Sequence, residues 1–366
     1  MTPLKKIRIV CISDTHNTTP KLPAGDILIH AGDLTNQGSY AELERSVAWL
    51  SGCAFEARVV VCGNHDIPLD APFHARAAGG WKWPSPQNPQ ACRNLLLNAR
   101  GITYLEHSST TIHLSSGVRV KIFGSPYSPL APGGREWAFQ YDDSDAAQLW
   151  DAMPGDADVV VTHTPARGFV DGGRGCGGLG RRLGVVRPWL GVCGHVHGGR
   201  GVERVFWDGL QVERWRDPGE GNGRLSVVDA TRRRGGEWVR VSARRGSGEA
   251  EEEEVLQPGA TMAMTTADAD VVEMESLADG ALGQSEALRI LRHTNGVERE
   301  LGCERRETVM VNAAVLGPRV GGKTGGFQKP IVVDVELPVV GTPPHRKPGQ
   351  HARQHARHRP DCHDAR

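Results

Sequence analysis

The sequence predicts an α/β protein, and two kinds of pattern lead to this prediction. Short apolar, β-branched runs repeatedly end in polar clusters; the clearest run covers residues 59–61 and ends in Gly63-Asn64-His65-Asp66. A helical pattern precedes this strand, as expected for a crossover between parallel strands. In open α/β sheets the carboxyl ends of the strands carry the ligand site, so these clusters are candidate functional residues.

Composition limits the classes of partner. The 366-residue chain has 43 Lys and Arg and 43 Asp and Glu, so its formal net charge is zero. This balance argues against a nucleic-acid partner, and no apolar run approaches the roughly 18 residues that a membrane span needs. The eight cysteines are spread singly, without a C-x-x-C pair. Together with an amino terminus that lacks a signal-peptide pattern, they indicate free thiols in a cytoplasmic protein.

The first hundred residues are expected to alternate strands with helices. Strands are predicted over residues 6–12, 26–29 and 59–61. Ser39-Tyr40-Ala41-Glu42 has the form of a capping box, and apolar residues follow it at helical spacing, which predicts a helix over 39–50. Residues 67–100 are rich in Pro, Gly and Trp and are expected to form a long loop with one short helix, over 94–99.

The following residues add further strands. A hairpin or two adjacent strands are expected over residues 110–113 and 118–123, a helix over 144–153, and strands over 157–161, 189–193 and 205–207. A glycine-rich span, residues 172–180, lies ahead of the strand at 189–193. Each of the strands at 157–161 and 189–193 is followed by histidines, in Thr162-His163-Thr164-Pro165 and Gly194-His195-Val196-His197.

The composition changes after residue 215. Residues 216–306 hold few aromatic residues, three successive arginines and the acidic run 249–254, which predicts a low-order insertion with one isolated helix over 285–293. Strand patterns resume at 308–315 and at 331–337, where apolar residues alternate with Asp334 and Glu336 as in a half-buried strand.

The predicted organisation therefore has four parts. They are a core over 1–215, the insertion over 216–306, further core strands over 307–341 and a disordered, basic, His-rich tail over 342–366. A metal-binding or anion-binding role is the alternative for the tail.

Eight side chains at the strand ends share one chemistry. Each is a carboxylate, an imidazole or an amide: Asp14, His16, Asp33, Asn64, His65, His163, His195 and His197. Such ligands suit divalent first-row metals, whereas structural zinc sites favour thiolates. Two ions that share a carboxylate can bind both the attacking and the transferring oxygens of a phosphate ester. The pattern predicts two divalent ions, of Mn, Fe, Zn or Mg, and a small phosphoester substrate.

The ordered set D-x-H, G-D, G-N-H-D, T-H-T-P and G-H-V-H resembles the calcineurin-like metallophosphoesterase superfamily. The resemblance covers residues 6–207 and resumes at 309–314 and 330–337, which look like the closing strands of that fold. It implies a four-layer αββα sandwich of two mixed sheets. Phrases such as Gly124-Ser125-Pro126-Tyr127 look like metallophosphoesterase-domain-containing proteins and their fungal relatives.

The resemblance also implies a role for each site residue. One ion would be held by Asp14, His16 and His197 and the other by Asn64, His163 and His195, with Asp33 bridging them. A hydroxide between the ions would attack phosphorus, and His65 would stabilise the transition state or protonate the departing oxygen. Asp66 would orient His65, although a helix-capping role is equally expected for it.

The substrate is narrowed by departures from other branches of the superfamily. Gly32 to Gly38 lacks the arginine typical of metal-dependent protein Ser/Thr phosphatases, and Asn36 stands where purple acid phosphatases have a tyrosine ligand. The resemblance implies phosphodiester hydrolysis, with a cyclic nucleotide as one candidate. Alternatives are a phosphomonoesterase, a protein Ser/Thr phosphatase, a nuclease and a metal-bearing protein-binding scaffold. Arg200 is a candidate contact to a phosphate or a base, and Trp137 a candidate base contact; surface and packing roles are their alternatives.

Overall fold

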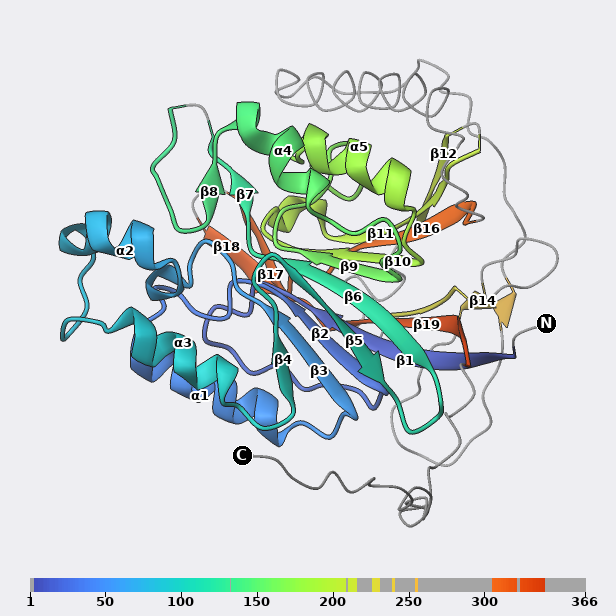
Figure 1. The fold of residues 1–366 in the computed structure, drawn as a ribbon, viewed down its shortest axis with the longest axis horizontal. Helices are drawn as coiled ribbons and strands as arrows, with labels where there is room; N and C mark the ends of the chain where they lie inside the picture. Colours follow the sequence, from blue (N-terminus) through green and yellow to red (C-terminus); the bar gives the residue numbers. More distant parts are fainter. Residues whose placement is uncertain are drawn as a thin grey trace, which may run out of the picture.

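Two large sheets face each other in the structure, a computed structural model (Figure 1). It describes residues 3–131, 133–208, 210–215, 226–230, 239–240, 254–255, 305–320 and 323–339. The helix expected over 285–293 and the His-rich tail lie outside these residues. Helices α1, α2 and α3 lie on one side of the sheet pair and α4 and α5 on the other (Figure 1). The expected four-layer sandwich is confirmed.

The first sheet has the strand order β15-β14-β13-β19-β1-β2-β3-β4. Four neighbouring strands run parallel and end at one edge of the sheet: β1 (Leu4–Ile12), β2 (Ile27–Ala31), β3 (Ala57–Val61) and the edge strand β4 (Ile102–Tyr104). Helix α1 (Tyr40–Gly52) connects β2 to β3 and begins with the predicted capping box, in which Ser39 Oγ accepts from Glu42 N–H and Glu42 Oε2 accepts from Ser39 N–H. The local sequence therefore fixed where this helix begins.

The prediction of a long loop over residues 67–100 is wrong, because this segment is largely helical. It contains the 3₁₀ turns Ile67–Leu69 and Ala78–Gly80 and helices α2 (Ala71–Ala77) and α3 (Pro89–Leu97). Asp70 accepts from Phe73 N–H at the start of α2, and Asn88 accepts from Ala91 N–H at the start of α3. Pro68, Pro72 and Pro89 stand in first turns, where a missing N–H costs no intrahelical bond, and only Pro84 and Pro86 lie in the connecting loop.

The second sheet has the order β12-β11-β16-β10-β9-β6-β5. The predicted hairpin is present as β5 (Ser108–His113) and β6 (Arg119–Ser125), which pair antiparallel. The other strands are β9 (Val159–Thr162), β10 (Leu190–Cys193), β11 (Gly201–Phe206), β12 (Gln211–Trp215) and β16 (Glu307–Asn312). Strands β9, β10 and β16 run parallel, so β16 completes this sheet from a segment more than a hundred residues further along the chain.

Two helices cover the outer face of the second sheet. The expected helix over 144–153 is present as the 3₁₀ turn Asp143–Asp145 and α4 (Ala146–Asp151). Helix α5 (Gly177–Val186) occupies part of the glycine-rich span and was not predicted. A Cβ added at Gly178 would lie 2.8 Å from Ala146 Cβ, so glycine lets α5 approach α4 closely.

Short strand pairs complete the set of elements. Strands β7 (Ser128–Pro129) and β8 (Gln140–Tyr141) pair in parallel, and β17 (Leu316–Val320) and β18 (Lys323–Phe327) form a hairpin. At one edge of the first sheet lie β14 (Val239–Arg240) and β15 (Glu254–Val255). None of the helices in the described part of the chain is long and apolar enough to cross a membrane.

Residues 226–229 depart from the expected low-order insertion. They form β13 (Ser226–Asp229), which pairs in parallel with β19 (Ile331–Pro338). Val227 and Val228 are buried there, because β19 lies between β1 and β13 and presents apolar side chains to both cores. The pairing partner of β13 lies a hundred residues away, and local composition does not reveal it.

Three apolar clusters hold the four layers together. The central cluster lies between the sheets and includes Ile9, Val61, Val161 and Val311. A second cluster packs α1 and α3 against the first sheet, and a third packs α4 and α5 against the second. Among the described cysteines, Cys11, Cys62, Cys92, Cys176 and Cys193 are buried and Cys53 is half-buried; all six are free, as predicted.

The alternating pattern of β19 predicts that Asp334 faces solvent, and this prediction is wrong. Its side chain is fully buried and accepts from Arg8 Nε and Nη2 at 2.8 Å and from Lys6 Nζ at 3.0 Å. Burial raises the pKa of this carboxyl, but the bonds to Arg8 and Lys6 outweigh burial and lower it below its ordinary value. The carboxylate therefore helps to attach β19 to β1.

Replacing Asp334 with asparagine should lower the free energy of unfolding at pH 7 by about 1 kcal/mol, a modest effect because both cationic partners are half exposed. The folded-state pKa lies below the unfolded one, so this stabilisation is present above the unfolded pKa and disappears as pH falls through the folded pKa. Urea unfolding of wild type and D334N at neutral and acidic pH measures both effects. A difference that does not shrink in acid would contradict the charge-based explanation, and E44Q on the exposed face of α1 is the control.

Candidate metal centre

The carboxyl ends of five strands converge on one place. Strand β1 leads to Asp14 and His16, β2 to Asp33, β3 to Asn64 and His65, β9 to His163, and β10 to His195 and His197. The structure brings all of these predicted residues together, as the parallel strands β1 to β3 and β9 to β10 require. Their roles as ligands or catalytic groups stay predictions.

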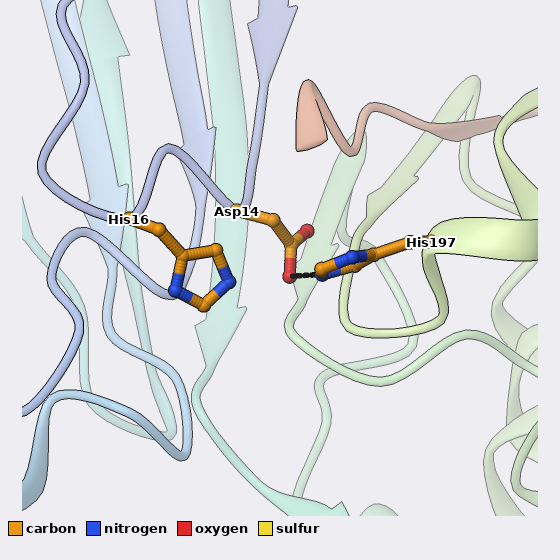
Figure 2. A group of neighbouring side chains, drawn as sticks. All are labelled: Asp14, His16 and His197. Carbon is orange, nitrogen blue, oxygen red and sulfur yellow. Dashed lines mark hydrogen bonds and ion pairs between the residues drawn. The ribbon is translucent and has the colours of Figure 1, made fainter. Parts of the chain in front are cut away.

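The first group of potential ligands consists of Asp14, His16 and His197. One donor atom from each lies within 4.8 Å of the others, and His197 Nε2 is 3.2 Å from Asp14 Oδ1. Figure 2 shows Asp14 between the two imidazoles, with His16 on the same loop and His197 facing it from the 3₁₀ turn His197–Gly199, which follows β10 of the second sheet. A carboxylate and two imidazoles at this spacing can hold a divalent ion.

The second group consists of Asp33, His163 and His195, again with donor atoms within 4.8 Å of one another. Asn64 joins it, because Asn64 Oδ1 lies 3.0 Å from His163 Nε2. The other ring nitrogen of His163 lies 2.9 Å from Ala31 O, to which it donates. That bond fixes the ring so that Nε2 points at Asp33 and Asn64.

Asp33 lies between the two groups. Its Oδ1 is 3.4 Å from His163 Nε2, and its Oδ2 is 3.7 Å from His16 Nε2. Each carboxylate oxygen therefore faces a different group, which is the geometry required of a ligand shared by two ions.

Two further observations indicate that these side chains suit a pair of metal ions. His16 Nε2 is buried and has no hydrogen-bond partner among the described residues, although buried polar atoms are normally paired. A metal ligated by this nitrogen would remove that deficit. The donor set is two carboxylates, four imidazoles and an amide oxygen, a set typical of divalent first-row ions.

The backbone is unusual where the ligands stand. Asp14, His16, Asp33 and His195 have φ between 43° and 65°, the left-handed region that non-glycine residues rarely adopt. Such conformations persist only where surrounding contacts impose them, and they concentrate at functional sites. Each turns its side chain sharply from the strand direction toward the centre.

Glycines next to the ligands allow the groups to approach. A Cβ added at Gly194 would collide with the side chains of Ser13 and Asp14, and one at Gly63 would collide with Asp33. The glycines of the G-N-H and G-H-V-H patterns thus have a steric explanation, since no larger residue fits beside the carboxylates.

Electrostatics keep the two carboxylates ionised. Burial opposes ionisation of Asp14 and Asp33, but surrounding imidazoles and their hydrogen bonds lower both pKa values below the ordinary range. For His163, burial alone would lower the pKa, and the charge of Asp33 raises it to about 9. His195 has no such direct pairing, and burial lowers its pKa to about 4, which leaves it neutral and able to ligate.

His65 lies beside the ligands and is oriented by a backbone carbonyl. Its Nδ1 is 2.8 Å from Asn36 O, and because a carbonyl only accepts, Nδ1 carries the proton. Nε2 is then the nitrogen able to exchange a proton with substrate. His65 also falls in one group of potential ligands with His16 and Asp33, so its distinction from a ligand rests on experiment.

Asp66 was predicted to orient His65, and this prediction is wrong, because its side chain makes other contacts. Asp66 is fully buried and accepts from the backbone of Gly63, Leu34 and Thr35 and from Thr35 Oγ1. Burial, reinforced by the nearby charge of Asp33, raises its pKa to about 6. Asp66 therefore ties the loop after β3 to the loop that carries Asp33, and its oxygens are occupied there.

Trp137 packs on His65 from outside. The ring centroids are 4.3 Å apart, and Trp81 lies 5.0 Å from Trp137 on a tilted contact. The Arg135 guanidinium lies over both tryptophans, at 4.3 Å from Trp81 and 5.4 Å from Trp137. Trp137 thus has ring neighbours already, which favours the packing alternative over base stacking.

Two further side chains, Arg200 and His30, hold backbone or loop segments together near the centre. Arg200 donates from Nη1 to Ala314 O and from Nη2 to Lys329 O, both at 2.8 Å, so it braces strand ends instead of facing the ligands. His30 Nε2 lies 2.9 Å from Thr15 Oγ1, and Gly32 N–H donates to its Nδ1 at 3.3 Å. Burial lowers the pKa of His30 to about 3, so it is a neutral link between the β1 and β2 loops.

A cavity of about 800 Å³ opens beside His195 and His197. Arg167, Arg174 and Asp143 also line it. The sequence patterns did not single out these three residues. The available signal was the glycine-rich span that follows Thr162-His163-Thr164-Pro165, since glycine-rich loops after a strand often approach ligands closely.

Known proteins share the part of the chain that builds this centre. The family model described as calcineurin-like phosphoesterase matches residues 7–199. Metallophosphoesterase domain-containing protein 1 of Homo sapiens and that of Mus musculus are each 35% identical over 215 residues, covering 53% of this chain and 62% of the relative. Probable rhamnogalacturonate lyase C of Emericella nidulans is 40% identical over 205 residues, covering 55% of this chain and 18% of the relative.

The chain spans less than two thirds of the length of these relatives. The family model, however, covers just over half of this chain and contains every strand-end residue discussed above, from Asp14 to His197. The resemblance seen in the order of the motifs is therefore confirmed, and this protein belongs to the calcineurin-like phosphoesterase family.

Proposed function

We propose that this protein hydrolyses small-molecule phosphodiesters with two divalent metal ions, and a cyclic nucleotide is one candidate substrate. The observation that carries the proposal is the position of Asp33, whose two oxygens face two separate groups of potential ligands. Asp14, His16 and His197 would hold one ion, and Asn64, His163 and His195 the other. Two such ions supply the positive charge that attracts a phosphate ester and stabilises charge developing on its oxygens.

His65 provides the acid. With Nδ1 held by Asn36 O, a protonated ring presents Nε2–H toward the centre and can donate to the oxygen that leaves phosphorus. Its backbone N–H donates to Asp33 Oδ1 at 2.8 Å, so the acid and the shared carboxylate are positioned by one contact. Trp137 covers the ring and restricts its movement.

The cavity beside the centre supports a diester. A phosphodiester carries two ester groups, of which one leaves and one is retained. His65 lies on one side of the metal centre, where the leaving group would accept its proton. The cavity beside His195 and His197 can receive the retained ester group on another side. Its volume falls within the range of small-ligand pockets.

The relatives' names support the same chemical class in different degrees. The human and mouse proteins are named for a metallophosphoesterase domain. The name of the fungal relative describes a lyase, but this chain matches only 18% of that protein. The calcineurin-like phosphoesterase family model, over residues 7–199, includes the metal-ligand candidates, which favours phosphoester hydrolysis for this chain.

The purified protein should contain about two divalent metals per chain and should cleave a bis-aryl phosphodiester faster than the matching aryl monoester. Metal analysis and initial rates with bis(p-nitrophenyl) phosphate and p-nitrophenyl phosphate measure this. Faster monoester cleavage would favour a phosphomonoesterase. Metal-replete protein inactive on both esters, on cyclic nucleotides and on phosphopeptides would contradict hydrolysis and favour a scaffold.

A further inference from the structure

The cavity beside the metal centre has a positively charged wall. Arg167 and Arg174 line it together with Asp143 and the histidines His195 and His197. Both arginines are exposed to the cavity and the surrounding solvent. The proposed phosphate position needs neither of them, because the ligand groups centre on Asp33 and not on this wall.

Arg167 and Arg174 stand on one braced loop. Asp171 is buried and accepts from the backbone N–H groups of Gly168, Gly173 and Gly175 at 3.0 to 3.1 Å. Arg167 N–H donates to Cys176 O, and Arg174 N–H donates to Asp171 O. The two arginines are therefore held at fixed points on the chain and not on a loose surface segment.

The arginine side chains keep donors available. Arg167 uses Nε to donate to Gly175 O at 3.1 Å, which leaves its two terminal nitrogens without a partner among the described residues. The Arg174 guanidinium has no hydrogen bond or ion pair within the described part of the chain. Planar guanidinium groups with free N–H pairs bind phosphate oxygens in a bidentate manner.

The arginine loop is fastened to the loop that carries His195 and His197. Asn312 Nδ2 donates to both Val170 O at 3.0 Å and Val196 O at 2.9 Å, so one side chain joins the two loops. Gly199 lies so close to Val170 and Asp171 that an added Cβ would collide with their backbone. The backbone that carries the arginines thus keeps a fixed position relative to the candidate ligands.

We propose that this cavity is a subsite for a second phosphate group, carried by the substrate in addition to the ester that is cleaved. The inference rests on the proposed function and narrows its substrate class to phosphodiesters that bear a further phosphate monoester. The two guanidinium groups would bind that phosphate while the scissile ester lies at the metal centre. The two arginines contribute two positive charges and Asp143 contributes one negative charge. These three side chains therefore leave a net charge of plus one at the cavity.

Equilibrium binding tests this subsite without turnover. The probes are two pairs with different phosphate spacing: adenosine 3′,5′-bisphosphate with 5′-AMP, and fructose 1,6-bisphosphate with fructose 6-phosphate. With the metal-loaded full-length chain, calorimetry should show at least one bisphosphate binding about tenfold or more tightly than its monophosphate, and the ratio should fall with added salt.

Variants locate the effect. In R167Q/R174Q, the bisphosphate should lose most of its advantage over the monophosphate, while R181Q on the exposed face of α5, which makes the same charge change per residue, should keep it. Equal affinities within both pairs in wild type would overturn the subsite, whatever the variants do. If R167Q/R174Q weakened the binding of bisphosphate and monophosphate equally, the subsite would be overturned too. The arginines would then act on both ligands through their general positive electrostatic field.

The outcome for the subsite is separable from that for the proposed function. Protein that prefers bisphosphates but hydrolyses no ester would contradict hydrolysis alone. Protein that cleaves bis(p-nitrophenyl) phosphate but shows no bisphosphate preference would contradict the subsite alone.

Discussion

Replacing His65 with alanine is expected to reduce turnover of a phosphodiester about 10²-fold or more, the usual contribution of a general acid, and to leave the metal content near that of wild type. The reason is the position of the ring: Nδ1 is engaged with Asn36 O, and Trp137 and His16 pack on its faces, so Nε2 is the free nitrogen. The measurements are kcat with bis(p-nitrophenyl) phosphate and metal content per chain.

The choice of leaving group sharpens this test. An aryl group with a low pKa needs less protonation than an alkyl group, so H65A should lose more activity on a dialkyl phosphodiester, whose leaving group is an alkoxide, than on the bis-aryl ester. H113A, which removes an exposed histidine of β5, is the matched control and should change neither quantity. Loss of metal from H65A would show instead that His65 is a ligand, an outcome that its grouping with His16 and Asp33 makes a real test.

Replacing Asp33 with asparagine should have the larger effect. The amide keeps one oxygen but removes the charge that both ligand groups share, so metal content should fall from about two per chain to about one or fewer, and activity should fall further than in H65A. The pKa of His163 is raised to about 9 chiefly through Asp33, so the same change also removes the charge partner of that imidazole.

Metal analysis after dialysis measures the first effect, and phosphodiester turnover at saturating metal measures the second. D151N, which changes an exposed carboxyl of α4, is the control for the charge change itself. Wild-type metal content in D33N, with activity retained, would show that the two groups do not depend on a shared carboxylate. Circular dichroism separates metal loss from unfolding.

Much of the centre could be predicted because its residues follow strands directly. A β-branched run gives a strand, its end gives a loop, and the alternation of strands with the capped helix α1 gives parallel neighbours whose carboxyl ends coincide. Asp14, Asp33, Asn64 and His163 were found in this way. The helices α2 and α5 were missed because prolines and glycines were read as breakers, whereas here they stand in first turns or at a close helix contact.

The roles of individual residues within the centre were harder to predict from the sequence than their positions. Asp66 follows His65 in the chain, and adjacency suggested a contact between their side chains. The structure instead turns Asp66 toward the Asp33 loop and leaves His65 to Asn36 O. The direction of a side chain in a loop depends on the segments that it packs against, and Asp66 is bonded to Thr35, which is 31 residues away in the chain.

By itself the sequence determined the α/β class, the order of the main strands and the chemical type of the ligands, because these depend on local periodicity and on residue identity. Only the tertiary structure decided which oxygen of Asp33 faces which group, that Asp334 is buried against Arg8, and that β13 joins β19. It also placed Arg167 and Arg174 beside His195. Each of these results depends on contacts between segments far apart in the chain, and such contacts follow from the packing of whole layers and not from any single stretch.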